Sequence, residues 1–425
     1  MRSSGSSLDE WLVRLESFSP TEIVLGLERV EVLLERLQLP APEIVFHIAG
    51  TNGKGSSVAM LEALLRGQNL RVGAYTSPHI TRYNERIRID AREAADTEII
   101  EAFERIEAVR ESIPLTYFEY GTLAALLLFA DAEVDVAILE IGMGGRLDAV
   151  NAVEPTAGLI TNVALDHCAW LGSDVETIGT EKAGIMRPGK PTVFASPDAP
   201  QSVIGHARTV GAELILAGRD YDWSSEGERW SWRGTTRQLR DLERPPLAGD
   251  VQVQNAAGVL ALIEAAGLHD LLVENVINAA IGGVRLAGRA QRVSAGGEWM
   301  LDVAHNPAAA KTLADTLGAI DLSGPTAAII SMLDDKDVEE VVAALKGKVD
   351  SWVAVRAESP RALSASELGR RVANAADRSC LVADSLPQAM DHARALAGTA
   401  GLVLVTGSFY IVGPVLRALE IYSPR

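Results

Sequence analysis

A glycine-rich turn between an apolar run and a helix-like segment constrains this chain more than any other feature. Residues 43–57 read EIVFHIAGTNGKGSS, in which an apolar run of strand length precedes a turn with three glycines, a lysine and two serines. A strand, a glycine turn, a lysine and a helix wrap backbone N–H groups around a polyphosphate. Lys54 would reach the terminal phosphates, and Ser56 would lie near a magnesium ion. Because the common P-loop has a glycine where Ile48 stands, an ordinary glycine-rich turn remains the alternative.

The length and the charge of the chain bound its organisation. With 425 residues, of which 48% are hydrophobic, the chain can bury two sizeable cores, and two domains are the natural expectation. The formal net charge of −18 argues against nucleic acid as a partner. The same charge would repel anionic substrates at long range, so a phosphate site must carry its own cations.

No segment of the sequence predicts a membrane span. The best apolar candidate, 123–130, stops at Asp131, whereas a membrane helix needs about 18 apolar residues. The first residues, MRSSGSSLDEW, lack the apolar run of a secretory signal. Two cysteines, Cys168 and Cys380, make no disulfide framework and no metal cluster. We therefore expect a soluble protein of the reducing cytoplasm.

Strand-like and helix-like segments alternate along the first two thirds of the chain, which predicts a mainly parallel sheet with helical crossovers. The expected strands span 44–48, 71–75, 84–89, 135–141 and 157–161. The expected helices span 8–39 (two helices broken at Ser19-Pro20), 96–112, 116–130, 177–187 and 252–266. Short polar-aromatic strands over 221–242 predict hairpins at an edge of the sheet.

A second series of strands follows the glycine-rich stretch 282–297. These expected strands span 299–303, 327–332, 352–355, 380–383 and 402–406, each followed by a helix. We predict an α/β fold with an N-terminal P-loop ATPase domain, built on a mainly parallel sheet, over 1–287. A smaller C-terminal Rossmann-like α/β domain, without a glycine fingerprint of its own, would span 288–425.

Polar residues follow several of the expected strands. Ser77, Glu140 and His167 would meet the Lys54 loop at one edge of a parallel sheet, where open α/β sheets bind their ligands. A hydroxyl, a carboxylate and an imidazole beside a triphosphate make a magnesium site. Each residue alone has a structural interpretation, such as a helix cap, and only the joint pattern favours the metal.

Two further groups carry charge at expected strand or helix ends. Lys182, in the segment GTEKAG, would be either a solvated side chain or a phosphate contact. Arg289, Asp302, His305 and Asn306 cluster around the first strand of the second domain. We expect them to face the nucleotide site across a cleft, although they could also be surface polar residues in loops.

The chain resembles the folylpolyglutamate synthase/dihydrofolate synthase family, within the Mur-ligase-type superfamily. The resemblance rests on segments in the family's order and spacing, from about Leu25 to Tyr410: HIAGTNGKGSS, YTSPHI, NERIRI, LTYFEYGT, LEIGMGGRLDAVN, ITNVALDH, WLG, IGTEKAGI, LDVAHNP, MLDDKD and TGSFY. It implies an ATP-dependent ligase that joins L-glutamate to dihydropteroate and then adds further glutamates to reduced folates. The implied cofactors are ATP and two magnesium ions. The implied partners are these small molecules, and we expect a monomer.

The resemblance also implies residue roles. The ATP-binding residues would be Thr51, Asn52, Gly53, Lys54, Gly55 and Ser56, completed by Asn255, Arg289 and Asp302. The magnesium ligands would be Ser77, Glu140, His167 and Lys182, the last matching a lysine that is carboxylated by CO₂ and so supplies oxygen. The pterin-binding residues would be Thr21, Glu22, Ile23, Val24, Thr116, Tyr117, Phe118, Glu119, Leu147, Asp148 and Ala149. His305 and Ser408 match positions associated with the incoming glutamate, and Lys54, Lys182 and His305 would act directly in catalysis.

The sequence departs from the family pattern at few positions. Val24 stands where relatives often have aspartate, which bears on the pterin pocket, and Asp334 replaces a common histidine. Two other functions remain as alternatives. A Mur-type peptide ligase would need a UDP-binding domain, for which the roughly 40 residues before the phosphate loop leave no room. A nucleotide-dependent switch would have little use for the Asp302 and His305 cluster.

Overall fold

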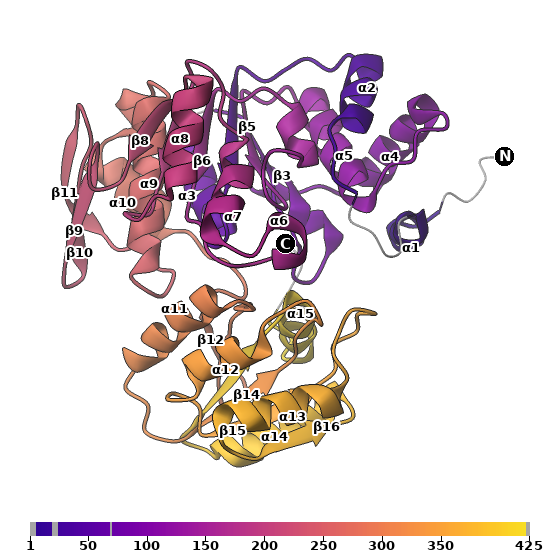
Figure 1. Ribbon diagram of the computed structural model, residues 1–425, viewed down its shortest axis with the longest axis vertical. Coiled ribbons are helices and arrows are strands. Elements are labelled where there is room, and N and C mark those ends of the chain that lie inside the picture. Colours follow the sequence, from indigo (N-terminus) through magenta and orange to yellow (C-terminus); the bar gives the residue numbers. More distant parts are fainter. Residues whose placement is uncertain (1–5, 19–23, 69, 422–425) are drawn as a thin grey trace. The chain divides into compact units, whose positions relative to one another are not determined.

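The computed structural model describes residues 6–18, 24–68 and 70–421, and the chain forms two compact units. The first unit comprises residues up to Val163 together with Val175–Arg244 and Gln254–Val284. The second comprises Ala164–Asp174, Pro245–Val253 and the residues from Arg285 onward. The chain therefore enters the second unit twice before its C-terminal third (Figure 1). The division into 1–287 and 288–425 stays a prediction.

The first unit is built on an eight-stranded sheet. In spatial order its strands are β4 (Arg92–Glu93), β3 (Ile87–Ile89), β2 (Val72–Tyr75), β5 (Val136–Glu140), β1 (Ile44–Ala49), β6 (Ala157–Ile160), β7 (Pro191–Phe194) and β8 (Glu213–Leu216). All pairs from β2 to β8 are parallel, and only β3 and β4 run antiparallel to their neighbours. The predicted, mainly parallel sheet is confirmed.

Helices cover both faces of this sheet. They are α1 (Leu8–Phe18), α2 (Glu28–Leu37), α3 (Lys54–Arg66), α4 (Asp96–Arg110), α5 (Tyr117–Asp131), α7 (Val175–Ala183), α8 (Gln201–Val210), α9 (Val251–Ala265) and α10 (Glu274–Gly282). Helices α4 and α5 lie on one face, and α3 and α9 lie on the other (Figure 1). Short 3₁₀ turns occur at η1 (Tyr83–Arg86), η2 (Ala149–Ala152) and η3 (His269–Leu271).

Helix α5 forms because its sequence caps one end and is apolar all round. The Thr116 hydroxyl accepts a hydrogen bond from the Glu119 N–H, and the Glu119 carboxylate accepts one from the Thr116 N–H. The residues from 119 to 129 are all buried, as expected of a helix within a core. The helix lies so close to β2 that a Cβ on Gly73 would stand 2.6 Å from the Phe129 ring.

A separate three-stranded antiparallel sheet belongs to the first unit. It consists of β9 (Asp222–Glu226), β10 (Arg229–Arg233) and β11 (Gln238–Glu243). The Glu264 carboxylate on α9 accepts hydrogen bonds from the N–H and hydroxyl groups of both Thr235 and Thr236 in the β10–β11 turn. The predicted hairpins are therefore present, but they form a sheet of their own on α9 and do not extend the large sheet.

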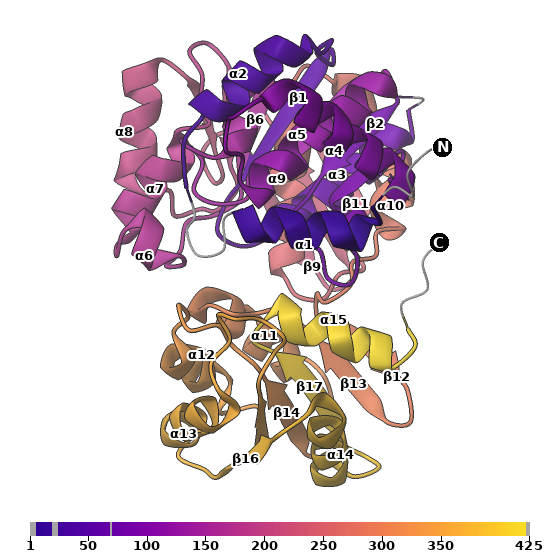
Figure 2. The same cartoon turned by 90° about the vertical axis from the view of Figure 1, so that its right-hand side faces the viewer.

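The second unit is built on a six-stranded sheet (Figure 2). In spatial order its strands are β12 (Gln291–Ser294), β13 (Glu298–Leu301), β17 (Leu402–Thr406), β14 (Thr326–Ile330), β15 (Ser351–Val355) and β16 (Cys380–Ala383). Only β12 is antiparallel to its neighbour. The helices are α6 (Cys168–Leu171), α11 (Pro307–Gly318), α12 (Val338–Leu345), α13 (Ala365–Ala376), α14 (Leu386–Ala397) and α15 (Phe409–Ala418). The predicted Rossmann-like α/β unit is confirmed.

Some predicted elements were wrong in extent. The strand expected over 84–89 begins with η1, because the Glu85 carboxylate accepts N–H bonds from Ile80, Thr81 and Arg82 and so stabilises a turn. The helix expected over 177–187 ends at Ala183, because the N–H groups of the next three residues donate to carbonyl oxygens only three positions earlier, as in a tight turn. Elements β7, α8 and β8 were not predicted, and β12 lies within the glycine-rich stretch 282–297, where no strand was expected.

In the described part of the chain, no helix combines the length and the apolar character that crossing a membrane requires.

Candidate functional site

The glycine turn after β1 is shaped so that only glycine fits at two positions. Gly50 has φ +143°, and a Cβ there would stand 1.8 Å from the Thr161 hydroxyl. Gly53 has φ +85° and forms the N-cap of α3, where a Cβ would stand 2.7 Å from Asn255 Oδ1. The turn therefore lies against Thr161 at the end of β6 and against Asn255 on α9. Asn255, which the family resemblance assigned to the nucleotide, is in contact with the loop.

The polar atoms of this turn leave a place for an anion. Lys54 Nζ donates to the carbonyl oxygens of Gly50 and Thr51, at 3.1 and 3.3 Å, so its ammonium lies over the turn. Asn162 fixes the turn from β6, accepting from the Thr51 and Asn52 N–H groups. The first N–H groups of a helix lack partners inside the helix and attract anions. The buried hydroxyls of Ser56 and Ser57 have no hydrogen-bond partner among the described residues. Buried donors without a partner at the mouth of a helix fit a polyphosphate.

Ser77 lies just beyond the end of β2, and Glu140 is the last residue of the adjacent parallel strand β5. The Ser77 N–H donates to Glu140 Oε2 at 3.2 Å, and β5 itself pairs with β1, which leads into the glycine turn. The carboxyl ends of three neighbouring strands thus bring the Lys54 loop, Ser77 and Glu140 to one edge of the sheet. Among the described residues, no group of three or more His, Cys, Asp and Glu side chains could hold a metal by itself. A metal here would therefore need Ser77 or Lys182 as a further ligand.

Lys182 lies in α7 and is only 3% exposed, which excludes the solvated position considered for it from the sequence. Its helix packs against the loop that follows β5. The Arg146 N–H donates to the Glu181 carbonyl at 2.8 Å, and a Cβ on Gly145 would stand 3.1 Å from Lys182 Cα. Lys182 is therefore buried beside the loop that begins after Glu140.

The three segments assigned to the pterin lie together in the first unit. Arg29 connects two of them, because its guanidinium forms an ion pair with Glu119 at 2.7 Å and donates to the Val24 carbonyl at 2.8 Å. The Gly26 N–H donates to the Leu147 carbonyl at 3.2 Å, which joins the third segment. Thr21, Glu22 and Ile23 lie outside the described residues.

Phe118 and Asp148 meet at Gly142. A Cβ on Gly142 would stand 2.6 Å from the Phe118 ring and 3.3 Å from Asp148 Oδ2. The Phe118 ring also lies 5.9 Å from the Tyr75 ring, between their centroids, and Tyr117 stacks edge-on against Tyr83. An aromatic ring beside a carboxylate suits a flat heterocycle with N–H donors.

Asp148 is buried and titrates near neutrality. Burial raises its pKa to about 7, and the opposing effects are the backbone N–H donors of Met143, Val150 and Gly142 and the charge of Lys54. Its two carboxylate oxygens accept from Met143 at 2.9 Å and from Val150 at 3.0 Å, the latter capping η2 beside Ala149.

Arg289 and Asp302 belong to the second unit. Asp302 accepts from the N–H groups of Ala290 at 2.7 Å and Ala304 at 2.8 Å, and burial raises its pKa although the Arg289 charge opposes this. The Arg289 guanidinium lies 5.4 Å from the centre of the Phe409 ring. The centre of the His305 ring lies 6.0 Å from the centre of the same Phe409 ring. Ser408 precedes Phe409, is 4% exposed and caps α15 by accepting from the Tyr410 N–H. These predicted residues form one group around Phe409.

His305 also contacts an aspartate that the sequence did not single out. Its Nε2 lies 3.3 Å from Asp166 Oδ2, and its Nδ1 lies 2.8 Å from the Val303 carbonyl. Lys336 Nζ donates to Asp166 Oδ1 at 2.5 Å, and the Asn306 amide donates to Oδ2 at 3.0 Å. Burial would raise the pKa of Asp166, but the hydrogen bond and charge of His305, with His167 and Lys336, hold it well below its usual range.

His167 directly follows Asp166 and belongs with it to the second unit. Its φ of +52° is a left-handed conformation that few residues other than glycine adopt. Its N–H donates to the Asp166 carboxylate at 2.8 Å. The four expected metal ligands therefore divide between the units: Ser77, Glu140 and Lys182 lie in the first, and His167 lies in the second.

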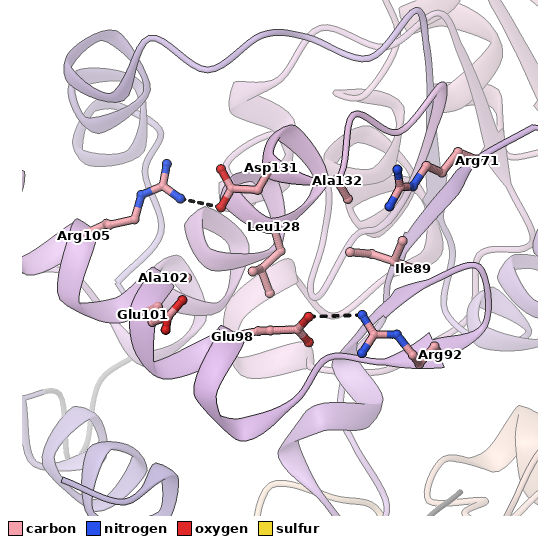
Figure 3. Close-up of a pocket in the computed structure, with 10 residues that line it drawn as sticks. All are labelled: Arg71, Ile89, Arg92, Glu98, Glu101, Ala102, Arg105, Leu128, Asp131 and Ala132. Carbon is pink, nitrogen blue, oxygen red and sulfur yellow. Dashed lines mark hydrogen bonds and ion pairs between the residues drawn. The ribbon is translucent and has the colours of Figure 1, made fainter. Parts of the chain in front are cut away.

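A cleft of about 280 Å³ lies elsewhere in the first unit (Figure 3). Arg71, at its edge, precedes β2, whereas Ser77 follows that strand, so the cleft is at the opposite end of the sheet from the phosphate loop. Two ion pairs cross it, Arg92 with Glu98 and Arg105 with Asp131. None of the predicted site residues lines this cleft, and we do not assign the chemistry to it.

Two family models match this chain. The model described as "Mur ligase middle domain" matches residues 48–263, and the one described as "Mur ligase, glutamate ligase domain" matches residues 288–409.

Curated proteins and solved structures match nearly the whole chain. The dihydrofolate synthase/folylpolyglutamate synthase of Escherichia coli K12 is 41% identical over 419 residues, which cover 98% of this chain and 96% of that protein. The protein of the same name from Haemophilus influenzae is 35% identical, with 98% of each chain covered. The structure "E.coli FolC in complex with DHPP and ADP" has a TM-score of 0.92 at 40% identity and covers 99% of both chains. A bifunctional folylpolyglutamate synthase/dihydrofolate synthase "with Mn, AMPPNP and L-Glutamate bound" has a TM-score of 0.89 at 42% identity and covers 98% of both.

Proposed function

The chain belongs to the dihydrofolate synthase/folylpolyglutamate synthase family of Mur ligases, and from this we propose how its own residues perform that reaction. The enzyme ligates L-glutamate to dihydropteroate and further glutamates to reduced folates, at the expense of ATP. The observation that carries the assignment of residues is the contact network of the first unit. In it, the pairing of β5 with β1 and β2 brings the glycine turn beside the Ser77–Glu140 pair, and contacts of Arg29, Phe118 and Asp148 connect the pterin segments.

The reaction follows from the chemistry of its substrates. A carboxylate is a poor acyl donor, so the γ-phosphoryl group of ATP is first transferred to it, which gives an acyl phosphate and ADP. The α-amine of glutamate then attacks the acyl carbon, the C–O bond to phosphate breaks, and an amide and inorganic phosphate result. The amine loses one proton in this step. Enzymes promote such transfers mainly by positioning and by neutralising charge.

The glycine turn supplies the nucleotide contacts. Backbone N–H groups at the start of α3 and the Lys54 ammonium would bind the phosphates, and the Ser56 hydroxyl would complete the cradle. Asn255 supports the turn at Gly53. The family resemblance adds Arg289 and Asp302, of the second unit, to the ATP-binding residues, and an aspartate suits hydroxyl donors such as those of a ribose.

A divalent cation fits the same edge of the sheet. Ser77 and Glu140 would hold it there, and Lys182 would join them after carboxylation, because hard cations prefer oxygen ligands. The family resemblance adds His167, of the second unit, to these ligands. When bound, magnesium neutralises charge on the phosphates during transfer. The burial of Lys182 beside the loop after Glu140 supports this assignment, since a buried amine in this position is better explained by a modified ligand than by a solvated cation.

The pterin would lie against Phe118 and hydrogen-bond to Asp148. Thr116, Tyr117 and Glu119 at the start of α5, Leu147 and Ala149 around η2, and the turn 21–24 would form the rest of this pocket. Val24 is 43% exposed, and its carbonyl accepts from Arg29, so the absence of the aspartate common in relatives is compatible with a backbone contact at this position.

Glutamate would bind in the second unit near His305 and Ser408. We propose the division of labour that the sequence suggested, with 1–287 holding ATP and the pterin substrate and 288–425 bringing the amino acid. Exclusion of water would protect the acyl phosphate from hydrolysis. We further propose that the protein acts as a monomer in the cytoplasm, where its reduced cysteines and acidic surface suit it.

Phosphate release tests the proposal. Purified protein should release phosphate only when ATP, magnesium, L-glutamate and dihydropteroate are all present, and dihydrofolate should accumulate in equal amount. Tetrahydrofolate in place of dihydropteroate should also support release. Activity with a UDP-linked cell-wall precursor instead would favour the Mur-type peptide ligase, and nucleotide binding without any glutamate-dependent release would favour a switch.

A further inference from the structure

The carboxylate of Asp166 has polar contacts with four residues of the second unit. Oδ1 accepts from Lys336 at 2.5 Å and from the His167 N–H at 2.8 Å, and Oδ2 lies 3.0 Å from the Asn306 amide nitrogen and 3.3 Å from His305 Nε2. All of these residues belong to the second unit. Asp166 and Lys336 are each 8% exposed, and Asn306 is 2% exposed.

The partners of Asp166 constrain one another. Asn306 is the N-cap of α11, where its side-chain oxygen accepts from the Ala309 N–H, so its amide nitrogen is left to donate to Asp166. The His305 ring is held from both sides, because Nδ1 lies against the Val303 carbonyl and Nε2 lies against the Asp166 carboxylate. Because Asn306 immediately follows His305, one carboxylate fixes both the ring and the start of the helix behind it.

The Asp166 carboxylate is shared between two side chains of this network. One carboxylate serves the Lys336 ammonium and a His305 ring that faces acceptors on both nitrogens. The next acidic group, Asp335, lies 3.6 Å from Lys336 but is paired with Arg361 at 2.8 Å. On the other side of His305, Asp302 faces Arg289. Ammonium and imidazole N–H groups are donors that bind carboxylates, and the amino acid proposed as the substrate of this unit carries two carboxylates.

We propose that Asp166 is a positioning residue for the amino-acid substrate, which holds the His305 ring and the Lys336 side chain in the orientation that glutamate binding requires. The inference rests on the proposed function, and it adds a residue to which no role had been given. Asp166 touches neither ATP nor the pterin in this role and acts through His305 and Lys336. Its loss should therefore affect the constants for glutamate selectively.

The test compares two asparagine substitutions on either side of Lys336. Asp166→Asn keeps the size of the side chain but removes the charge that orients His305 and Lys336. Asp335→Asn removes the same charge 3.6 Å from the same lysine without touching His305. Asp166→Asn should raise the KM for glutamate at least tenfold and leave the KM values for ATP and dihydropteroate within twofold. Asp335→Asn should leave all three within twofold.

Other outcomes would overturn the inference. An unchanged KM for glutamate in folded Asp166→Asn would show that the residue does not position the amino-acid site. Equal changes in all three KM values, with a lower melting temperature, would show that it is only structural. If Asp166→Asn does not fold, Lys336→Gln takes its place with the same threshold for glutamate, and failure to meet it has the same meaning.

The wild-type protein separates this inference from the function beneath it. If the wild type shows no glutamate-dependent phosphate release, the proposed function fails, and this inference fails with it. If the wild type is active and Asp166→Asn keeps the wild-type constants, only the role of Asp166 is refuted.

Discussion

The wild-type protein should become less stable as the pH rises, because the buried carboxyl group of Asp148 ionises. The Asp148→Asn variant should lack this contribution. The carboxyl group of Asp148 is fully buried in the first unit, and burial raises its pKa from 3.8 to about 7. Between these two values the folded protein binds a proton that the unfolded chain has released. Stability from this group is therefore complete below pH 3.8 and is lost progressively as the pH rises to 7.

The magnitude follows from the linkage relation. One proton changes the free energy of unfolding by about 1.4 kcal/mol for each pH unit in this window. Between pH 5 and pH 7 the wild type should lose about 2–3 kcal/mol through Asp148, and above pH 7 the loss should level off. Asparagine cannot ionise. Its NH2 group, a donor, would also face the N–H donor of Met143 or Val150, so the variant should be less stable than the wild type at pH 5. On going from pH 5 to pH 8 its free energy of unfolding should fall by less than that of the wild type.

Urea unfolding of both proteins at pH 5, 6, 7 and 8, followed for the transition of the first unit, measures this difference. Other groups titrate alike in the two proteins and cancel in the comparison. Asp131→Asn provides the control, because it is the same substitution in the same unit at an exposed carboxylate paired with Arg105. If the wild type and Asp148→Asn differ by the same free energy at every pH, to within about 0.5 kcal/mol, the buried protonated carboxyl is refuted.

Three further predictions concern the reaction. Glu140→Ala should abolish phosphate release with little change in melting temperature, because the metal site loses a charged ligand; full activity in the folded variant would remove Glu140 from the site. Phe118→Ala should raise the KM for dihydropteroate about tenfold and leave that for ATP nearly unchanged, through lost aromatic contact; equal effects on both would argue against this pocket. Lys182→Ala should be nearly inactive and recover partly with acetate, which replaces the carbamate oxygens, whereas Lys182→Arg should not recover. A mass spectrum of the active protein without a carboxylated Lys182, together with no acetate rescue, would contradict the modification.

The elements that carry the site were predictable where the signal is local. The glycine turn, the apolar runs before Ser77 and Glu140, and the capping pair Thr116–Glu119 each lie within a few residues, so their order alone predicts a strand end or a helix start. Elements β7 and β8 escaped prediction. Strand β7 opens on Pro191, and β8 opens on Glu213 and is only partly buried, so neither stands out as an uninterrupted apolar run.

The burial of Lys182 could not be read from its own segment. The helix α7 is short, and its buried side is set by the loop at Gly145, about 37 residues earlier in the chain. Chemistry inferred from GTEKAG alone therefore favoured a solvated or phosphate-bound lysine. The burial of this side chain depends on contacts that only the folded unit supplies.

Asp166 shows the same limit for a charged network. The sequence gives a signal, since an acidic residue stands directly before His167 in the segment that follows β6. The partner that explains it, Lys336, lies 170 residues away, in a turn that sequence periodicity describes only as a loop. A buried carboxylate must find cations wherever the fold places them, because its desolvation is costly without them. Residues that act through others are therefore recognised from their contacts, and the selective change in the KM for glutamate is what distinguishes such a residue from an ordinary buried ion pair.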